Sequence, residues 1–142
     1  MLERFLRRRK EERTSEEIER NQKRRRAAAR LADEIRQCGQ EFPYPIIKII
    51  LFGGVAKKAD RSDSDIDIAV VFDGVYHLDQ SAGGVKSEEW LNRIANWVAR
   101  EEFGNDFRIL PFHVTCVGRG LFESLKNLSV VIKAIHQDGI DL

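Results

Sequence analysis

The most restrictive stretch of this 142-residue chain is LFGGVAKKADRSDSDIDIAVVF, from Leu51 to Phe72. Three aspartates, Asp63, Asp65 and Asp67, stand there at alternate positions directly ahead of an apolar, β-branched run. Strand side chains alternate between faces, so the three carboxylates are predicted to share one face. Like charges so close together repel each other, and the pattern therefore indicates either a bound cation or a polar turn that leads into the strand.

Two strands are predicted to flank this motif. Ile46 to Phe52 is short, β-branched and bounded by proline and glycine, which favours a buried strand over a helix. Gly53 and Gly54 follow, and VAKKA leaves room for one helical turn. In the second strand one face is expected to carry Ile66, Ile68, Val70 and Phe72, and the other the aspartates, Ala69 and Val71.

Helical periodicity predicts three longer helices. The first, a long charged surface helix, runs from about Ser15 to Gln37, with Ser15 as its N-cap. The second is opened by Ser87 and closed by Gly104. It is expected to turn inward Trp90, Leu91, Ile94, Trp97 and Val98. The third ends at Gly139 and carries its apolar residues at helical spacing, namely Leu121, Phe122, Leu125, Leu128, Val131, Ile132 and Ile135.

A third strand, residues 107–117, lies between the last two helices, and Pro111 predicts that it is an edge strand or is bulged. The resulting order is α, β, short α, β, α, β, α. This order predicts an α+β fold, a mixed sheet with helices packed on it. We expect a basic helical arm over residues 1–40, followed by one domain over residues 41–142.

Charge is unevenly distributed along the chain. The whole chain carries a formal net charge of +1, yet residues 1–36 hold 13 Lys and Arg against 8 Asp and Glu. Such an arm is either a solvated helix or a surface for nucleic acid or an acidic partner. It lacks the interleaved aromatic residues that stack on bases, which makes sequence-specific nucleic-acid recognition an unfavourable interpretation.

Composition also bears on the compartment. No apolar run is long enough to span a bilayer, and the N-terminus does not have the pattern of a secretory signal, so a cytoplasmic protein without a membrane segment is expected.

Cys38 and Cys116 lack metal-site spacing and are predicted to be buried free thiols. His77 and His136 have no partner spacing and are predicted to be surface histidines.

The chemistry that best accounts for the aspartates is magnesium binding. Mg²⁺ prefers oxygen ligands and is commonly held by one or two carboxylates together with the oxygens of a bound phosphate. Gly53 and Gly54, at the start of a short helix, would supply free backbone N–H groups to that phosphate. Lys57 or Lys58 would add positive charge.

Three other interpretations compete with this one. Asp63, Asp65 and Asp67 match the first ligand positions of an EF-hand loop, but Ile68 and Gly74 replace the glycine and glutamate that such a loop needs. A phosphatase nucleophile of the DxD type would follow a hydrophobic strand rather than precede one. A plain polar turn at the start of a strand stays open on the DxD pattern alone.

The complete spacing GGVAKKADRSDSDIDI, from Gly53 to Ile68, resembles the signature of the nucleotidyltransferase superfamily related to DNA polymerase β. In that signature a Gly-Ser or Gly-Gly pair is followed, after a short fixed interval, by Ser-Asp-x-Asp and an aliphatic residue. The chain is especially similar to the small minimal nucleotidyltransferases. The resemblance implies Mg²⁺ on Asp65 and Asp67, with two ions in the polymerase scheme, a nucleotide cradle at the glycine pair with Lys57, and Ser64 fixing the loop.

The chain departs from the family pattern at three positions. Gly54 replaces the commoner serine, and Lys58 stands where many members have a further glycine. A third carboxylate is usual on a later strand, but here His113 aligns with it as a candidate base or ligand, and Asp106 is kept in reserve. The histidine is also consistent with a site that has lost its activity, or with a different alignment.

The activity that the resemblance implies is Mg²⁺-dependent transfer of a nucleoside monophosphate, AMP by preference, from a nucleoside triphosphate to a protein or another hydroxyl acceptor. Minimal members resemble antitoxins that work with an all-helical HEPN partner. The chain lacks an added helical substrate domain after the core, which favours a protein partner, and a homo-oligomer is compatible with the sequence. The alternative is a nucleotide-binding or partner-binding homologue that has lost turnover with the third carboxylate.

Overall fold

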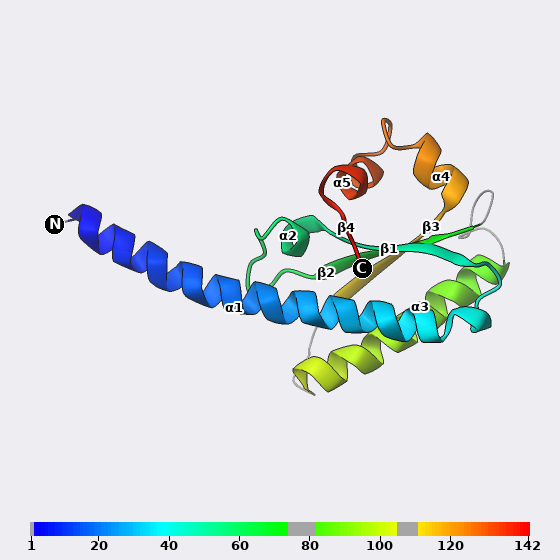
Figure 1. The fold of residues 1–142 in the computed structure, drawn as a ribbon, viewed down its shortest axis with the longest axis horizontal. Helices are drawn as coiled ribbons and strands as arrows, with labels where there is room; N and C mark the ends of the chain where they lie inside the picture. Colours follow the sequence, from blue (N-terminus) through cyan, green and yellow to red (C-terminus); the bar gives the residue numbers. More distant parts are fainter. Residues whose placement is uncertain (1, 74–81, 105–110) are drawn as a thin grey trace.

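The computed structural model describes residues 2–73, 82–104 and 111–142, with side chains from 15 and from 87 onward in the first two ranges. A four-stranded sheet lies at its centre in the order β3-β2-β1-β4 (Figure 1). The strands are β1 (Ile46–Phe52), β2 (Ile66–Phe72), β3 (Phe112–Gly118) and β4 (Ile140–Asp141). β1 pairs antiparallel with β2 and β4, while β2 and β3 are parallel, so the sheet is mixed as predicted.

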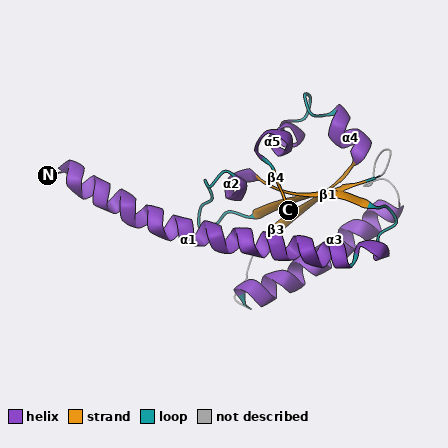
Figure 2. Ribbon diagram, in the orientation of Figure 1, coloured by secondary structure: helices purple, strands orange, loops and turns teal. Residues whose placement is uncertain are grey.

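The two faces of the sheet are covered by different helices (Figure 2). α1 (Leu2–Gln37) and α3 (Ala82–Phe103) pack on one face, and α4 (Arg119–Ser124) and α5 (Val130–Asp138) on the other. The short α2 (Gly53–Ala56) follows β1 directly. The N-terminal part of α1 extends well beyond the sheet (Figure 1).

Alternation along β2 divides the core as the sequence predicted. Ile66, Ile68, Val70 and Phe72 join the cluster that contains α1 and α3. Ala69 and Val71 join the cluster formed with Phe122 of α4 and Ile132 and Ile135 of α5. A strand buried on both sides needs apolar residues at consecutive positions, which explains the uninterrupted run after Asp67.

The first helix is longer than predicted, because α1 starts at Leu2 and continues through Ser15, which is therefore no N-cap. Ala27, Ala28, Leu31, Ala32 and Ile35 on α1 are completely buried against the sheet. After α1 the chain forms a short 3₁₀ helix, η1 (Gly39–Glu41). The boundary near residue 40 between an arm and a domain stays a prediction, and the last third of α1 contributes to the main core.

The C-terminal helix is a second correction. The stretch predicted as one helix forms two, α4 and α5, joined by a turn, and Ser129 caps α5 by accepting a hydrogen bond from the Ile132 amide. Leu128 in the turn is 81% exposed, and Val131 also faces solvent. The helical spacing of the apolar residues continues across the turn, which explains why one helix was predicted. No pattern in the sequence indicated the two-residue strand β4 after Gly139.

The second helix and third strand differ from prediction in detail. α3 begins at Ala82, so Ser87 lies inside the helix and does not open it as predicted. On α3, Leu91 and Val98 are buried as expected, but Trp90 and Trp97 are 37% and 47% exposed. Gly104 ends the helix with a positive φ, as predicted. β3 begins after Pro111, whose carbonyl accepts a hydrogen bond from the Ile66 amide, and it lies at the edge of the sheet, as the proline indicated.

Within the described parts of the chain, no helix combines the length and the apolar character needed to cross a bilayer.

Candidate functional site

The glycine turn and the second aspartate of the DxD pair meet where β1 ends and β2 begins. Phe52, the last residue of β1, pairs in register with Asp67. Gly53 has φ of +73°, and a Cβ placed on it would lie 2.3 Å from Asp67 Oδ2. Only glycine combines this backbone conformation with so close an approach. Asp67 therefore lies beside Gly53, whereas the predicted roles of these residues in metal and phosphate binding stay predictions.

The aspartate end of β2 lies outside the covered part of the sheet face. Ala69 and Val71 on the same face are buried beneath α4 and α5, whereas Asp67 is half-buried with 28% of its side chain exposed. Asp65 precedes β2 and is exposed. Asp63 lies in the turn before it, so its predicted place on the strand face is wrong.

The ionised form of Asp67 is destabilised by its surroundings. Burial raises the pKa of this carboxyl above its ordinary value, His113 lowers it in part, and the negative charge of Asp65 raises it again. A group whose pKa is raised by folding costs stability once the pH rises through that pKa. A cation beside the two aspartates would favour the ionised form and remove this cost.

His113 occupies the neighbouring position on β3. It pairs in register with Asp67, and its Nδ1 lies 3.4 Å from Asp67 Oδ1. Its side chain is 68% exposed. The alignment of His113 with the usual third-carboxylate position thus corresponds to adjacency in space, whereas Asp106, the reserve candidate, and His77 lie outside the described residues.

The other histidine and the cysteines are distinct from this site. His136 stacks on Phe122 at 4.0 Å between ring centroids, and its Nε2 lies 2.9 Å from the Phe122 carbonyl oxygen. Cys38 and Cys116 are free and partly buried. Burial raises the pKa of Cys116 to about 12, which keeps this thiol protonated at neutral pH.

The residues predicted to surround the nucleotide lie along the loop that joins α2 to β2. Ser64 Oγ accepts a hydrogen bond from the Arg61 amide at 2.8 Å and closes a turn just before Asp65. Lys57 Nζ lies 3.4 Å from Asp138 Oδ2 at the end of α5. Lys58 has φ of +58° and therefore adopts the left-handed conformation that favours glycine.

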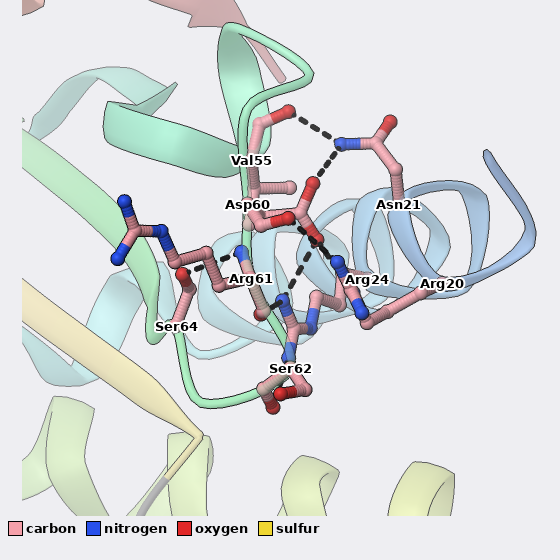
Figure 3. A network of polar contacts seen from close by, with 8 residues as sticks. All are labelled: Arg20, Asn21, Arg24, Val55, Asp60, Arg61, Ser62 and Ser64. Atoms are coloured by element: carbon pink, nitrogen blue, oxygen red, sulfur yellow. Dashed lines mark hydrogen bonds and ion pairs between the residues drawn. The ribbon is translucent and has the colours of Figure 1, made fainter. Parts of the chain in front are cut away.

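Sequence reasoning missed the most connected residue near the site, Asp60. Its carboxylate is 2% exposed, and Arg24 contacts it at 2.7 Å (Figure 3). Arg20 and Asn21 of α1 contact it as well. Arg24 follows Asn21 by three residues and Arg20 by four, and these spacings place the side chains on one face of a helix, but nothing local in the sequence indicates a partner about 40 residues away.

Family comparison agrees with this geometry. Residues 33–128 match the family model described as polymerase beta, nucleotidyltransferase. The chain belongs to this nucleotidyltransferase family. No curated protein matches it. A solved structure from Sulfolobus solfataricus, provisionally described as a nucleotidyltransferase, shares 15% identity, with a TM-score of 0.42 over 84% of this chain and 85% of that one.

The residues present fit a magnesium ion bound together with a nucleotide. Asp65 and Asp67 supply two carboxylates, which suffice for Mg²⁺ when substrate phosphates complete its ligands. The close approach of Gly53 to Asp67 leaves room for a phosphate-bearing ligand to meet both the glycine backbone and a carboxylate. Among the described residues no cluster of three or more His, Cys, Asp or Glu is arranged to hold a metal without substrate.

The contact between Gly53 and Asp67 generates the first prediction. Gly53→Ala and Gly104→Ala both place a Cβ at positive φ, but Gly104 has nothing within 4 Å. Urea unfolding should show that Gly53→Ala costs about 1–3 kcal/mol more than Gly104→Ala, because the new methyl overlaps the carboxylate.

A double-mutant cycle tests whether the overlap with the Asp67 carboxylate causes the extra loss of stability. Adding Asp67→Ala to Gly53→Ala should remove most of the extra loss, because the Asp67 Cβ itself would lie at an ordinary 3.4 Å from the new methyl. Equal losses for the two glycine variants would contradict the contact.

Lys58 gives a second prediction. Lys58→Gly should raise the free energy of unfolding by about 0.5–1 kcal/mol, since glycine removes the cost of the left-handed conformation. Lys57→Gly, at φ of −79°, should lower it. A destabilised Lys58→Gly protein in the same urea titration would show that the lysine side chain matters more than its backbone.

Proposed function

We propose that this protein transfers AMP from ATP, in a Mg²⁺-dependent reaction, to a hydroxyl group on a protein partner. The observation that carries the proposal is the contact of Asp67 with Gly53, which brings the acidic and phosphate-binding parts of the family signature together where β1 ends and β2 begins. The preference for AMP rests on the similarity to minimal nucleotidyltransferases.

Asp65 and Asp67 are the proposed metal ligands. When bound, Mg²⁺ neutralises charge on the triphosphate and stabilises the leaving pyrophosphate. Gly53 and Gly54 begin α2, and the first N–H groups of a helix lack intrahelical acceptors, so they are suited to phosphate oxygens. Lys57 is within reach of the same region and would exchange its exposed partner Asp138 for phosphate.

His113 is the proposed proton acceptor. The acceptor hydroxyl oxygen forms a bond to the α-phosphorus, the bond to pyrophosphate breaks, and the hydroxyl proton passes to the imidazole. Asp67 lies 3.4 Å from His113 Nδ1 and would orient the ring and stabilise its protonated form. An imidazole thus takes over the proton-accepting part of the missing carboxylate.

A macromolecular acceptor fits the exposure of the site. His113 is 68% exposed and Asp65 faces solvent, so a hydroxyl on a large partner has access without entering a deep cavity. The similarity to minimal nucleotidyltransferases makes an all-helical HEPN-type protein the preferred acceptor, with an antitoxin role. Under this proposal the protein works in the cytoplasm, where ATP and such a partner are present.

A second candidate is a binding protein without turnover. The observation that favours it is the same His113, because the site then has two carboxylates rather than three beside the nucleotide. In this version the protein binds ATP and Mg²⁺, or neutralises its partner by contact alone.

Labelling separates the two candidates. With labelled ATP, Mg²⁺ and the protein encoded by the adjacent gene, the wild type should label that neighbour, and Asp65→Asn and Asp67→Asn should each abolish the label. Asp63→Asn, in the exposed turn two residues away, is the matched control and should leave it intact. No labelling by the wild type, together with a higher melting temperature in ATP and Mg²⁺, would favour the binding protein.

The role of His113 is tested by its variants. His113→Ala should lower kcat by about 10²- to 10⁴-fold, the usual range for a lost base, with the affinity for ATP and Mg²⁺ changed far less. His113→Asp should retain more activity than His113→Ala, since aspartate restores the family's carboxylate. If His113→Ala transfers AMP at the wild-type rate, the imidazole is not the proton acceptor.

A further inference from the structure

We propose that one turn of α1 is a positioning clamp for the catalytic site, which it serves by fixing the loop between the glycine pair and the aspartates. The clamp consists of Arg20, Asn21, Arg24 and Arg25 of α1, and it holds residues 55–64, which are the end of α2 and the loop that follows it. The proposal rests on the nucleotidyltransferase function above. None of these four residues of α1 belongs to the family signature, and their sequence context predicted a solvated helix or a surface for nucleic acid or an acidic partner.

The clamp binds the first part of the connecting loop through its backbone. Asn21 Nδ2 donates to the Val55 carbonyl at 2.8 Å, and an Arg25 guanidinium nitrogen donates to the Ala56 carbonyl at 2.8 Å. These carbonyls belong to the last residues of α2, and the C=O groups at the C-terminal end of a helix need hydrogen-bond donors from outside the helix. α1 thereby fixes the short helix that begins at the glycine pair.

The later part of the loop is held in the same way (Figure 3). Arg20 donates to the Asp60 carbonyl at 2.7 Å, and Arg24 donates to the Arg61 carbonyl at 2.6 Å and the Ser62 carbonyl at 2.9 Å. Three successive carbonyls are thus bound by two guanidinium groups. Because hydrogen bonds to the backbone depend on its path, this contact specifies the loop conformation and not only its proximity.

Asp60 ties the clamp together from the loop side. Its buried carboxylate accepts from Asn21 at 2.8 Å and from Arg24 at 2.7 Å, and Arg20 Nε lies 3.5 Å away. Burial acts to raise the pKa of Asp60, but the hydrogen bonds from Asn21 and Arg24 and the charge of Arg24 bring the pKa below its ordinary value. The acid is therefore ionised and fully partnered, and it belongs to the clamp, not to the metal site.

Both ends of the held segment reach the site. A Cβ on Gly54 would lie 3.4 Å from the Asp60 α-carbon, so the loop backbone packs against the glycine pair. At the other end the Arg61 amide donates to Ser64 Oγ, and Asp65 follows at once. A shift of the loop would displace Asp65 relative to Gly53, and misplacement of about 1 Å can cost about 10²-fold in rate.

The test compares Arg24→Gln and Asp60→Asn with Arg26→Gln, which alters an exposed arginine on the same helix. Hydrogen exchange of the amides in residues 57–65, measured without nucleotide, should become at least about tenfold faster in the two clamp variants and stay unchanged in the control. Exchange in β1 should not change. Unchanged exchange in the loop would show that the clamp does not hold it.

The second readout is the affinity for ATP at increasing Mg²⁺, measured by calorimetry well below the melting temperature. The clamp variants should bind at least about tenfold more weakly, and excess Mg²⁺ should recover part of the loss, because the aspartates are present but poorly placed. Faster loop exchange with affinity within twofold of the wild type would make the clamp merely structural and overturn the proposal.

The test also decides the case where a variant does not fold and the case where the wild type binds no ATP. If Arg24→Gln does not fold, Arg24→Lys keeps the charge but loses the forked donor, and should show an intermediate loss in both measurements. If the wild type itself binds no ATP at any Mg²⁺ concentration, the proposed nucleotidyltransferase function fails, whereas the exchange experiment still decides whether α1 holds the loop.

Discussion

The structure depends on one close contact, that of the Gly53 backbone with the Asp67 carboxylate. The two residues meet because Phe52 and Asp67 are paired in the β1–β2 ladder, so the end of β1 and the start of β2 lie side by side. A side chain at position 53 would occupy the place of the carboxylate oxygen. Register and glycine therefore act together: the ladder sets which residues meet, and the absent Cβ lets backbone and carboxylate come within reach of a common ligand.

The two aspartates Asp60 and Asp67 lie in opposite electrostatic environments. Asp60 is more deeply buried than Asp67, yet its pKa is lowered because arginine and asparagine donors surround it. Asp67 keeps a raised pKa, since burial and Asp65 outweigh its single histidine neighbour. Donors therefore stabilise the ionised form of Asp60, whereas the ionised form of Asp67 would gain from a nearby cation. The arginines that make α1 appear basic are, at positions 20, 24 and 25, already engaged by the loop.

Features that depend on neighbouring residues in the sequence could be predicted, whereas features that depend on distant residues could not. The bounds of β1 and the two faces of β2 depend on local periodicity and turn residues, and both were predicted correctly. Periodicity alone misled where it crossed a turn, so Leu128 was assigned to one continuous helix although it lies in an exposed turn between two. Periodicity also could not show that Trp97 lies beneath Arg30 of α1 at the surface. The contacts of Asp60 with α1 span about 40 positions, and no local pattern encodes them.

The histidine beside Asp67 changes the charge of the site as well as its proton chemistry. Under the proposed function, an imidazole in place of the family's carboxylate removes one negative charge beside the triphosphate, which lowers the repulsion between protein and nucleotide. It also removes oxygen ligands, the kind that Mg²⁺ prefers, from the place where the polymerase scheme would hold a second ion. Under the proposed function, the two aspartates then suit a single ion shared with the phosphates, and proton transfer falls to His113, which lies close enough to Asp67 to be oriented by it. Such a site depends more on the placement of its two carboxylates than a three-carboxylate site does, because no third ligand compensates for an error in either. That dependence gives a physical reason for the loop to be held by a full turn of α1.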